Sequence, residues 1–349
     1  MNAPFLSLVI PVYNVGKYLP RTLGSALGQT FRDIEVVPVD DGSADDSREI
    51  IGTFAARDSR VRPLLLPRNT GSAWARKAGT EAAGGRFIVY MDGDDTLVPE
   101  ACGRIAAALR KEPVDLLQFN EKVVDETGLK DEAYRNVKRY LRTYIGRITS
   151  DDLIRDCVVT EYIPWNVHGK AFDAALAKRA AGRMKDSHIV MADDLYFFFI
   201  FLYYARTYRG LGGKGLYEYY FGRGITGRET LDLATFGKYC RQYIVHTLLE
   251  AFLEEEKADE KYFKSLRFLR GTLLGNCVQS YLTLAENDRA AGYEMLMGYV
   301  KDGALLDAAI ADRLRPAHRR TGPEKFRGFL HKYLPKRQER MLKKIYKKL

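Results

Sequence analysis

Cysteine is scarce in this sequence, and its placement excludes several classes of protein. The four cysteines are Cys102, Cys157, Cys240 and Cys277, and no two of them form a C-x-x-C pair. Because neither a disulfide framework nor a zinc site fits this spacing, we expect reduced thiols in a cytosolic protein. The first residues also lack the basic region, apolar core and small-residue cleavage site of a signal peptide, so we expect no secretion.

Long hydrophobic runs are absent as well. The longest apolar stretch, Leu195–Ala205, is far shorter than the roughly 20 residues that cross a bilayer as a helix. We therefore predict that this stretch is a buried core helix. With 349 residues and 46% hydrophobic composition, the chain is long enough for one large core and a second unit.

Several sequence fingerprints of enzymes are also missing. No G-x-G-x-x-G follows the first strand-like run, which argues against a dinucleotide dehydrogenase. The glycines of Gly210–Gly215 have the wrong spacing for G-x-x-x-x-G-K-[ST], which excludes the common ATPase scheme. Without H-E-x-x-H or G-x-S-x-G, zinc hydrolysis and serine-nucleophile acyl transfer have no support. The remaining scheme is one in which a metal ion and carboxylates bind the phosphate.

The pattern that is present is an alternation of strand-like and helical segments from Phe5 to about Asn120. It predicts an α/β unit, doubly wound, with a mostly parallel sheet and right-handed crossovers. Residues 121–150 are polar, and we expect a surface excursion there. The other expected elements are helices at 165–181 and 193–205, a strand at 216–221, and helices beyond Glu229 with breaks near Asp302, Pro316 and Pro323.

Two acidic clusters end two of the strand-like runs, at Val36–Ser47 and at Arg86–Leu97. The carboxyl ends of parallel strands meet at one sheet edge, where open α/β sheets bind ligands. We expect five carboxylates to gather there: Asp40, Asp41, Asp92, Asp94 and Asp95. So much negative charge favours a divalent cation that binds phosphate. The alternative is that these residues only form turns and helix caps.

These residues carry a resemblance to a known family. The segments LSLVIPVYNVGKYLPRTLGSALGQTFRDIEVVPVDDGSADDS, RNTGSAWARKAGTEAAGGRFIVYMDGDD and MADDLYF resemble GT-A family 2 glycosyltransferases of the bacterial cell-surface polysaccharide type. Members are inverting enzymes with nucleotide-sugar donors. The resemblance is close over about Phe5–Leu97, looser to Thr226 and absent beyond. It implies a GT-A domain at 1–228, with a nucleotide-sugar part at 1–120 and an acceptor-side part at 121–228. The helical pattern and the charge predict a helical region at 229–312 and a basic tail at 313–349.

The resemblance implies roles for residues on the donor side. Pro11, Tyr13 and Asp41 match positions that line the nucleoside pocket, and Asp40 is a second candidate for the contact to the base. The D-x-D motif corresponds to Asp92, Gly93 and Asp94, with Asp92 near the ribose. Asp94, together with Asp92, is expected to hold Mn²⁺ or Mg²⁺ against the diphosphate.

Further residues are implied around the reacting centre. Arg76 stands where the family commonly carries Arg followed by Asn, although Lys77 replaces that Asn here. Arg223 is the candidate for a diphosphate contact in the segment YEYYFGRGITG.

The catalytic base is implied by the segment MADDLYF. Asp194 matches the base and Asp193 its acidic neighbour; the alternative is helix capping by Asp193. Upstream, His168 takes an aromatic slot of the family, and Trp165 is a possible stacking surface for sugar. Either of these two residues could equally be core.

The basic charge of the protein is concentrated at its C-terminal end. Residues 313–349 hold 14 Lys or Arg and 2 Glu, a net charge of +12, so the rest of the chain sums to 10 − 12 = −2. Leu342, Ile345, Tyr346 and Leu349 form an apolar stripe, a pattern typical of a helix on an anionic membrane. A helix packed on the body is the alternative. Nucleic-acid binding is disfavoured because no recognised nucleic-acid module accompanies the charge.

Together these patterns predict an inverting, metal-dependent glycosyltransferase. We expect a UDP-sugar donor and a glycan or lipid-linked acceptor in cell-surface polysaccharide biosynthesis. The expected location is cytoplasmic, peripheral on the inner face of the cell membrane. Two alternatives stay open: a nucleotidyltransferase on a similar sheet, whose usual Gly-rich basic loop is missing here, and a non-catalytic membrane or glycan-binding adaptor.

Overall fold

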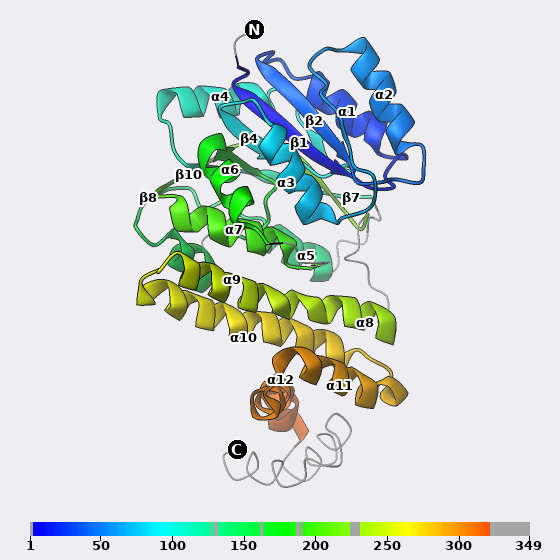
Figure 1. The fold of residues 1–349 in the computed structure, drawn as a ribbon, viewed down its shortest axis with the longest axis vertical. Helices are drawn as coiled ribbons and strands as arrows, with labels where there is room; N and C mark the ends of the chain where they lie inside the picture. The colour runs from blue at the N-terminus through cyan, green and yellow to red at the C-terminus, as the bar shows by residue number, and fades with distance from the viewer. Residues whose placement is uncertain are drawn as a thin grey trace. The chain divides into compact units, whose positions relative to one another are not determined.

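A computed structural model of the protein describes residues 3–126, 128, 132–160, 163–185, 189, 191–223 and 231–321 (Figure 1). The chain forms two compact units. The first consists of Met1–His188 with Asp193–Gly227, and the second of Ile189–Ala192 with Arg228–Leu349.

The first unit is built on an eight-stranded sheet with the order β3-β2-β1-β4-β9-β6-β10-β8. Strands β1 to β4 pair in parallel, as do β6 and β10, whereas β9 runs antiparallel to β4 and β6, and β8 antiparallel to β10. The strands are β1 (Leu6–Val12), β2 (Ile34–Asp40), β3 (Leu64–Leu65), β4 (Phe87–Tyr90), β6 (Leu116–Phe119), β8 (Arg147–Thr149), β9 (Lys170–Asp173) and β10 (Thr207–Leu211). The predicted mostly parallel sheet is confirmed.

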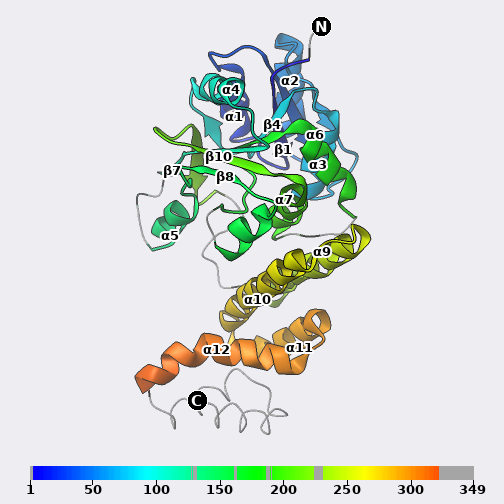
Figure 2. The same cartoon turned by 90° about the vertical axis from the view of Figure 1, so that its left-hand side faces the viewer.

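Helices cover both faces of this sheet, with α3 and α6 on the face opposite to α1 and α4 (Figure 2). Strand β1 is therefore buried on both sides and reads as a continuous apolar run. Helix α3 approaches β1 closely, since a Cβ atom on Gly79 would lie 2.4 Å from Val9 Cγ1. The helices of this unit are α1 (Leu19–Leu27), α2 (Ser47–Arg57), α3 (Ser72–Ala82), α4 (Ala101–Lys111), α5 (Glu132–Tyr140), the π-helix Arg155–Val159, α6 (Ala174–Arg183) and α7 (Asp193–Tyr204). The predicted doubly wound GT-A architecture is confirmed.

A second, three-stranded sheet has the order β5-β11-β7. Strand β11 (Tyr217–Phe221) pairs in parallel with β7 (Glu121–Asp125) and antiparallel with β5 (Thr96–Leu97). Because β5 follows the second acidic cluster directly, this sheet places the tyrosines of β11 beside the carboxylates that end β4. The strand predicted at 216–221 is confirmed.

Two expectations for the middle of the chain are wrong. The helix predicted at 165–181 begins only at Ala174, because Lys170–Asp173 forms β9 between β4 and β6. Asp173 then caps α6 by accepting a hydrogen bond from the Leu176 amide. The segment 121–150 is not only a surface excursion, since β7 and β8 belong to the two sheets. The buried helix predicted at 193–205 is confirmed by α7.

The second unit is helical, as predicted. Its helices are α8 (Leu233–Cys240), α9 (Ile244–Glu255), α10 (Glu260–Leu282), α11 (Arg289–Val300) and α12 (Gly303–Thr321). The predicted break near Asp302 is confirmed, but α12 continues through Pro316, so the break expected there is wrong. Across the described ranges, no helix is long and apolar enough to cross a membrane. The predicted membrane-binding stripe at 342–349 lies outside the described residues.

Candidate active site

The two acidic clusters flank the carboxyl end of β1, because β2 and β4 are its neighbours on either side. The Asp41 amide donates a hydrogen bond to the carbonyl of Val12 at 2.8 Å, which ties the end of β2 to β1. Gly93 lies against the same end, since a Cβ atom at this position would be 3.1 Å from the Pro11 carbonyl oxygen. The structure therefore brings Pro11, Asp41 and the D-x-D segment to one edge of the sheet.

The carboxylates after β2 are occupied by protein donors. Asp40 is fully buried and accepts two hydrogen bonds from the Arg48 guanidinium, at 2.7 and 3.0 Å. Asp41 accepts from the amide and hydroxyl of Thr70 and from the amide of Gly71, each at 2.7 Å. Both side chains therefore hold the loops around the sheet edge. In contrast, the predicted pocket residue Tyr13 leaves 47% of its surface exposed.

One guanidinium connects the second acidic cluster to the predicted base. Arg76, on α3, donates to Asp92 Oδ1 at 2.9 Å and to Asp194 Oδ1 at 2.6 Å. It also donates to Asp193 Oδ2 at 3.2 Å, and Ser72 Oγ donates to the same oxygen. We call these four charged residues, Arg76, Asp92, Asp193 and Asp194, the Arg76 cluster. The cluster joins the end of β4 to the first turn of α7, although the two acidic segments are about a hundred residues apart in the sequence.

The electrostatics of the Arg76 cluster suit a proton acceptor. Burial raises the pKa of Asp194 to about 6, Arg76 acts to lower it, and the charge on Asp193 adds to the rise. The amide of Val167 donates to Asp194 Oδ2 at 3.3 Å and fixes the carboxylate from the other side. A carboxylate with a pKa just below neutral is mostly ionised at pH 7 and is a stronger base than an ordinary Asp.

Asp94 and Asp95 differ although they are neighbours in the sequence. Asp95 is buried and accepts hydrogen bonds from the Tyr217 hydroxyl at 2.7 Å and the Tyr220 amide at 2.8 Å, so it anchors β11. Burial and the charges of Asp92 and Asp94 raise the pKa of Asp95 to about 8. The Asp94 carboxylate receives no side-chain hydrogen bond from the described part of the chain, and burial with the charge of Asp92 raises its pKa to about 6.

Arg223 lies beside the D-x-D segment, as predicted for a residue near the diphosphate. Its guanidinium donates to the backbone carbonyl of Asp94 at 3.0 Å and packs over the rings of Tyr18 and Tyr220. The same guanidinium forms an ion pair with Glu126. A ligand phosphate would therefore have to compete with Glu126 for this arginine.

The fit of a divalent cation depends on Asp94. Over the described ranges, no group of three or more His, Cys, Asp or Glu side chains is placed to hold a metal ion. The protein thus offers Asp94 and, shared with Arg76, Asp92. Two carboxylates completed by diphosphate oxygens and water are the usual ligand set of Mg²⁺ at nucleotide sites. The unpartnered, partly buried carboxylate of Asp94 fits that role, because a cation would relieve the cost of ionising it.

His168 is built into the site differently from its expected role. Its ring stacks on the rings of Tyr217 and Tyr219, with centroid distances of 5.2 and 5.4 Å. Its Nδ1 atom lies 2.7 Å from Glu121 Oε2. Burial acts to lower the pKa of His168, but the charge and hydrogen bond of Glu121 outweigh it and raise the pKa to about 9. His168 is thus a buried cation in the core of the site. Trp165 packs edge-on against Tyr140 at 6.3 Å.

Sequence reasoning missed Glu121, Tyr217 and the role of Tyr219. The alternation of tyrosines in YEYYF places Tyr217 and Tyr219 on one face of β11, and this signal is visible in the sequence. Glu121 carries no such signal, because it begins a polar stretch that resembles an ordinary loop.

Comparison with known proteins agrees with this geometry. Residues 7–163 match the family model described as Glycosyl transferase family 2. An uncharacterized glycosyltransferase of Haemophilus influenzae is 43% identical over 95 residues, 27% of this chain and 38% of that protein. Glycosyltransferase GlyG of Streptococcus pneumoniae is 35% identical over 122 residues, 35% of this chain and 40% of GlyG. The chain thus spans about two fifths of the curated relatives that it matches.

The fold also has solved counterparts. The crystal structure of S. aureus TarS 1-349 in complex with UDP-GlcNAc has a TM-score of 0.64 to this chain, with 19% sequence identity. The similarity covers 90% of this chain and 87% of that one. The protein therefore has the GT-A fold, and residues 7–163 of its N-terminal unit are similar to glycosyl transferase family 2.

Proposed function

We propose that the protein is an inverting, metal-dependent glycosyltransferase. It transfers a sugar from a nucleotide sugar, a UDP-sugar, to a hydroxyl of a glycan or lipid-linked acceptor in cell-surface polysaccharide biosynthesis. The observation that carries this proposal is the Arg76 cluster, in which a D-x-D carboxylate and the carboxylate of Asp194 converge on one guanidinium. The UDP-GlcNAc complex of TarS, which shares the fold, supports the choice of a UDP-sugar.

The donor is proposed to lie across the carboxyl ends of β1, β2 and β4. We propose that the exposed ring of Tyr13 and the loop held by Asp41 contact the nucleoside, with Pro11 as the floor beside Gly93. Asp40 supports this wall from the core through Arg48. Asp92 and Asp94 are proposed to face the diphosphate, and Arg223, which donates a hydrogen bond to the Asp94 carbonyl, is proposed to contact it as well.

The proposed chemistry requires one proton acceptor and stabilisation of one leaving group. Asp194 takes the proton of the acceptor hydroxyl while that oxygen attacks the anomeric carbon and the bond to the nucleoside diphosphate breaks. A single displacement of this kind inverts the anomeric configuration. Arg76 holds Asp194 in place and keeps it ionised, and Asp193 is fixed by Ser72. When bound, Mn²⁺ or Mg²⁺ would offset the charge that develops on the leaving diphosphate.

The location of the protein follows from the proposed acceptor. Residues 313–349 carry a net charge of +12, which suits the anionic inner face of a cell membrane, where a lipid-linked acceptor would be presented. We propose this tail as the peripheral membrane contact. The proposal is supported if the full-length protein binds anionic vesicles, is released from them by high salt and does not bind neutral vesicles. Equal binding to both kinds of vesicle would oppose it.

The test of the function is release of the nucleoside diphosphate from a panel of nucleotide sugars. Each donor is incubated with the purified protein in Mn²⁺, Mg²⁺ or EDTA, alone and with a mixture of oligosaccharide acceptors. We expect release from one UDP-sugar, dependent on the metal and lost in Asp94→Ala. Glu81→Ala, which removes an exposed carboxylate from α3, is the matched control and should retain the rate. No release from any donor, with or without acceptor, would contradict the proposal.

A further inference from the structure

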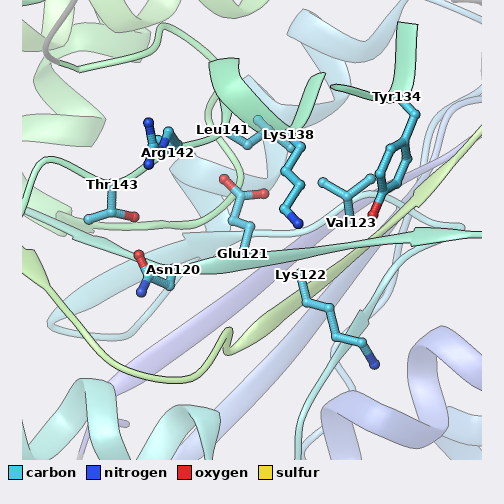
Figure 3. A pocket seen from close by; sticks show the side chains of 9 residues that line it. All are labelled: Asn120, Glu121, Lys122, Val123, Tyr134, Lys138, Leu141, Arg142 and Thr143. Atoms are coloured by element: carbon cyan, nitrogen blue, oxygen red, sulfur yellow. The ribbon is translucent and has the colours of Figure 1, made fainter. Parts of the chain in front are cut away.

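A cleft of about 460 Å³ opens between β7 and α5 (Figure 3). Its walls come from β7, from one face of α5 and from the segment that follows α5. Its charged lining residues are Glu121, Lys122, Lys138 and Arg142. The donor residues proposed above lie elsewhere, at the ends of β1, β2 and β4, and none of them lines this cleft.

A short segment links the cleft to the active site. The segment 166–168 contacts both: the Val167 amide donates to Asp194 Oδ2 at 3.3 Å, and the His168 ring bonds Glu121 Oε2 at 2.7 Å. The Asn166 amide also donates to Glu121 Oε1, at 3.4 Å. A three-residue segment thus separates a carboxylate of the cleft from the carboxylate of the proposed base.

Two of the four charges of the cleft are already neutralised. Glu121 is paired with His168, whose pKa is raised by this same carboxylate despite burial, to about 9, so the pair is formed at neutral pH. Lys122 pairs with Glu218 at 2.8 Å, and Figure 3 shows it pointing to the other side of β7 from Glu121. That direction follows from the alternation of side chains along a strand.

The other two charges have no partner. Lys138 and Arg142 form no ion pair within the described ranges, and Figure 3 shows Lys138 extending toward β7 on the side of Glu121. The lining also contains Thr143, whose Oγ1 is buried without a hydrogen-bond partner in the described structure. Buried polar atoms are normally bonded, so an unsatisfied hydroxyl in the same cleft as two exposed cations that form no ion pair with described residues marks a place that a polar ligand would complete.

We propose that the β7–α5 cleft binds the acceptor, and that this acceptor carries phosphate or carboxylate groups that Lys138 and Arg142 bind. The proposal rests on the proposed transferase function and assigns a substrate class to it. Arginine binds both kinds of anion through paired hydrogen bonds, and lysine acts as a point charge beside it. A neutral acceptor would leave both cations without a counter-charge.

The experiment uses the donor identified by diphosphate release. Transfer is measured to three sets of oligomers: neutral oligosaccharides, oligomers of a polyol phosphate and uronate-containing oligosaccharides. We expect one anionic set to be used and the neutral set to be poor, and the set used distinguishes phosphate from carboxylate. The double variant Lys138→Ala/Arg142→Ala should raise the acceptor KM at least about 10-fold, because hydrogen bonds to charged groups are worth more than neutral ones. Its donor KM and its acceptor-independent diphosphate release should not change.

The matched control is Arg135→Ala/Arg139→Ala, which removes two positive charges from the same helix outside the cleft. It should leave the acceptor KM unchanged. An equal rise of KM in both double variants would mean long-range attraction only and would overturn the proposal, as would preference for neutral acceptors. If no donor is turned over, calorimetric titration of the same oligomers into wild type and both double variants still tests the cleft. Anion binding that is lost only in the Lys138→Ala/Arg142→Ala variant supports the proposal. If neither the phosphate nor the carboxylate oligomers bind to wild type, the proposal is refuted.

Discussion

Two aspartate clusters end strands β2 and β4, which lie on either side of β1 in one sheet, and their carboxylates differ in their partners. After β2, the carboxylates of Asp40 and Asp41 are saturated by Arg48, Thr70 and Gly71. After β4, Asp92 shares its guanidinium partner with the base, and Asp94 has no side-chain partner in the described structure. The difference favours the cluster after β4 as the proposed reactive site, because the protein leaves the charge of that cluster incompletely compensated.

The largest effect is expected from removing the proposed base. Asp194→Asn should lower kcat by about 10²- to 10⁴-fold, the usual contribution of a positioned general base. The amide oxygen can still accept from Arg76, but the NH2 group then faces the Val167 amide, so the free energy of unfolding should fall by about 1–3 kcal/mol, too little to unfold the protein. Single-turnover rates and urea unfolding check the two parts. A variant with nearly full activity would place the base elsewhere.

Removing Arg76 should lower the stability of the protein as well as its activity. Arg76→Ala leaves three carboxylates close together without their common cation, and loss of one partner of a buried charge network costs about 3–5 kcal/mol. The loss of stability at pH 7 should shrink at pH 5, because Asp194 then takes up a proton. Glu81→Ala, at an exposed position of the same helix, is the control; a similar loss there would show a general effect of the helix.

Substitutions in the cluster after β2 should lower the free energy of unfolding. Asp41→Ala removes the acceptor of three hydrogen bonds and leaves the amides of Thr70 and Gly71 without a partner. Unsatisfied buried groups cost about 1–3 kcal/mol each, so we expect a total of at least about 2 kcal/mol. Thermal unfolding measures this effect. Unfolding indistinguishable from wild type would mean that the loop at Thr70 does not depend on Asp41.

The pH dependence should sharpen the comparison with a smaller effect. Because Asp194 must be ionised to accept a proton and its pKa is raised to about 6, kcat/KM should fall as pH drops through about 6. An ordinary Asp would keep the enzyme active to about pH 4. The profile of wild type between pH 4.5 and 8 decides this point. A flat profile down to pH 4.5 would show that Asp194 has no raised pKa in the working enzyme.

The smallest effect concerns the stability contribution of Asp94. Its folded pKa is raised to about 6, above the unfolded value, so its contribution to stability is full below the unfolded pKa and is lost as pH rises through about 6. Asp94→Asn should therefore gain stability over wild type at pH 7.5, without metal, and lose that gain at pH 4. Urea titrations at both pH values measure the difference. A gain that is equal at both pH values would not come from this titration.

Much of the fold was predictable because it rests on local patterns. The apolar runs of β1, β2 and β4 and the turn-forming acidic residues after them identified the sheet and its ligand-binding edge. Strand β9 was missed because Lys170–Asp173 is only four residues long and runs directly into the Ala-rich helix α6. Its place depends on pairing with β4 and β6, which local sequence does not encode.

The candidate site was predictable as a set of residues but not as a set of partners. Motifs identified Asp92, Asp193 and Asp194, yet Arg76 as their common partner depends on α3 and α7 packing side by side. The role of Glu121 could not be predicted, since its partner His168 is 47 residues away. Conversely, Asp40 and Asp41 read like ligand residues, and only the tertiary structure reveals Arg48 and the Thr70 loop as their partners.

The central claim is best tested by measuring turnover and unfolding together on Asp94→Ala and Asp41→Ala. Both variants are assayed for metal-dependent diphosphate release and, without metal, for the free energy of unfolding at pH 7.5. The account predicts that Asp94→Ala loses turnover and keeps or gains stability, while Asp41→Ala loses stability. If Asp94→Ala instead unfolds like Asp41→Ala, or keeps its metal-dependent turnover, the division of tasks between the two clusters is wrong.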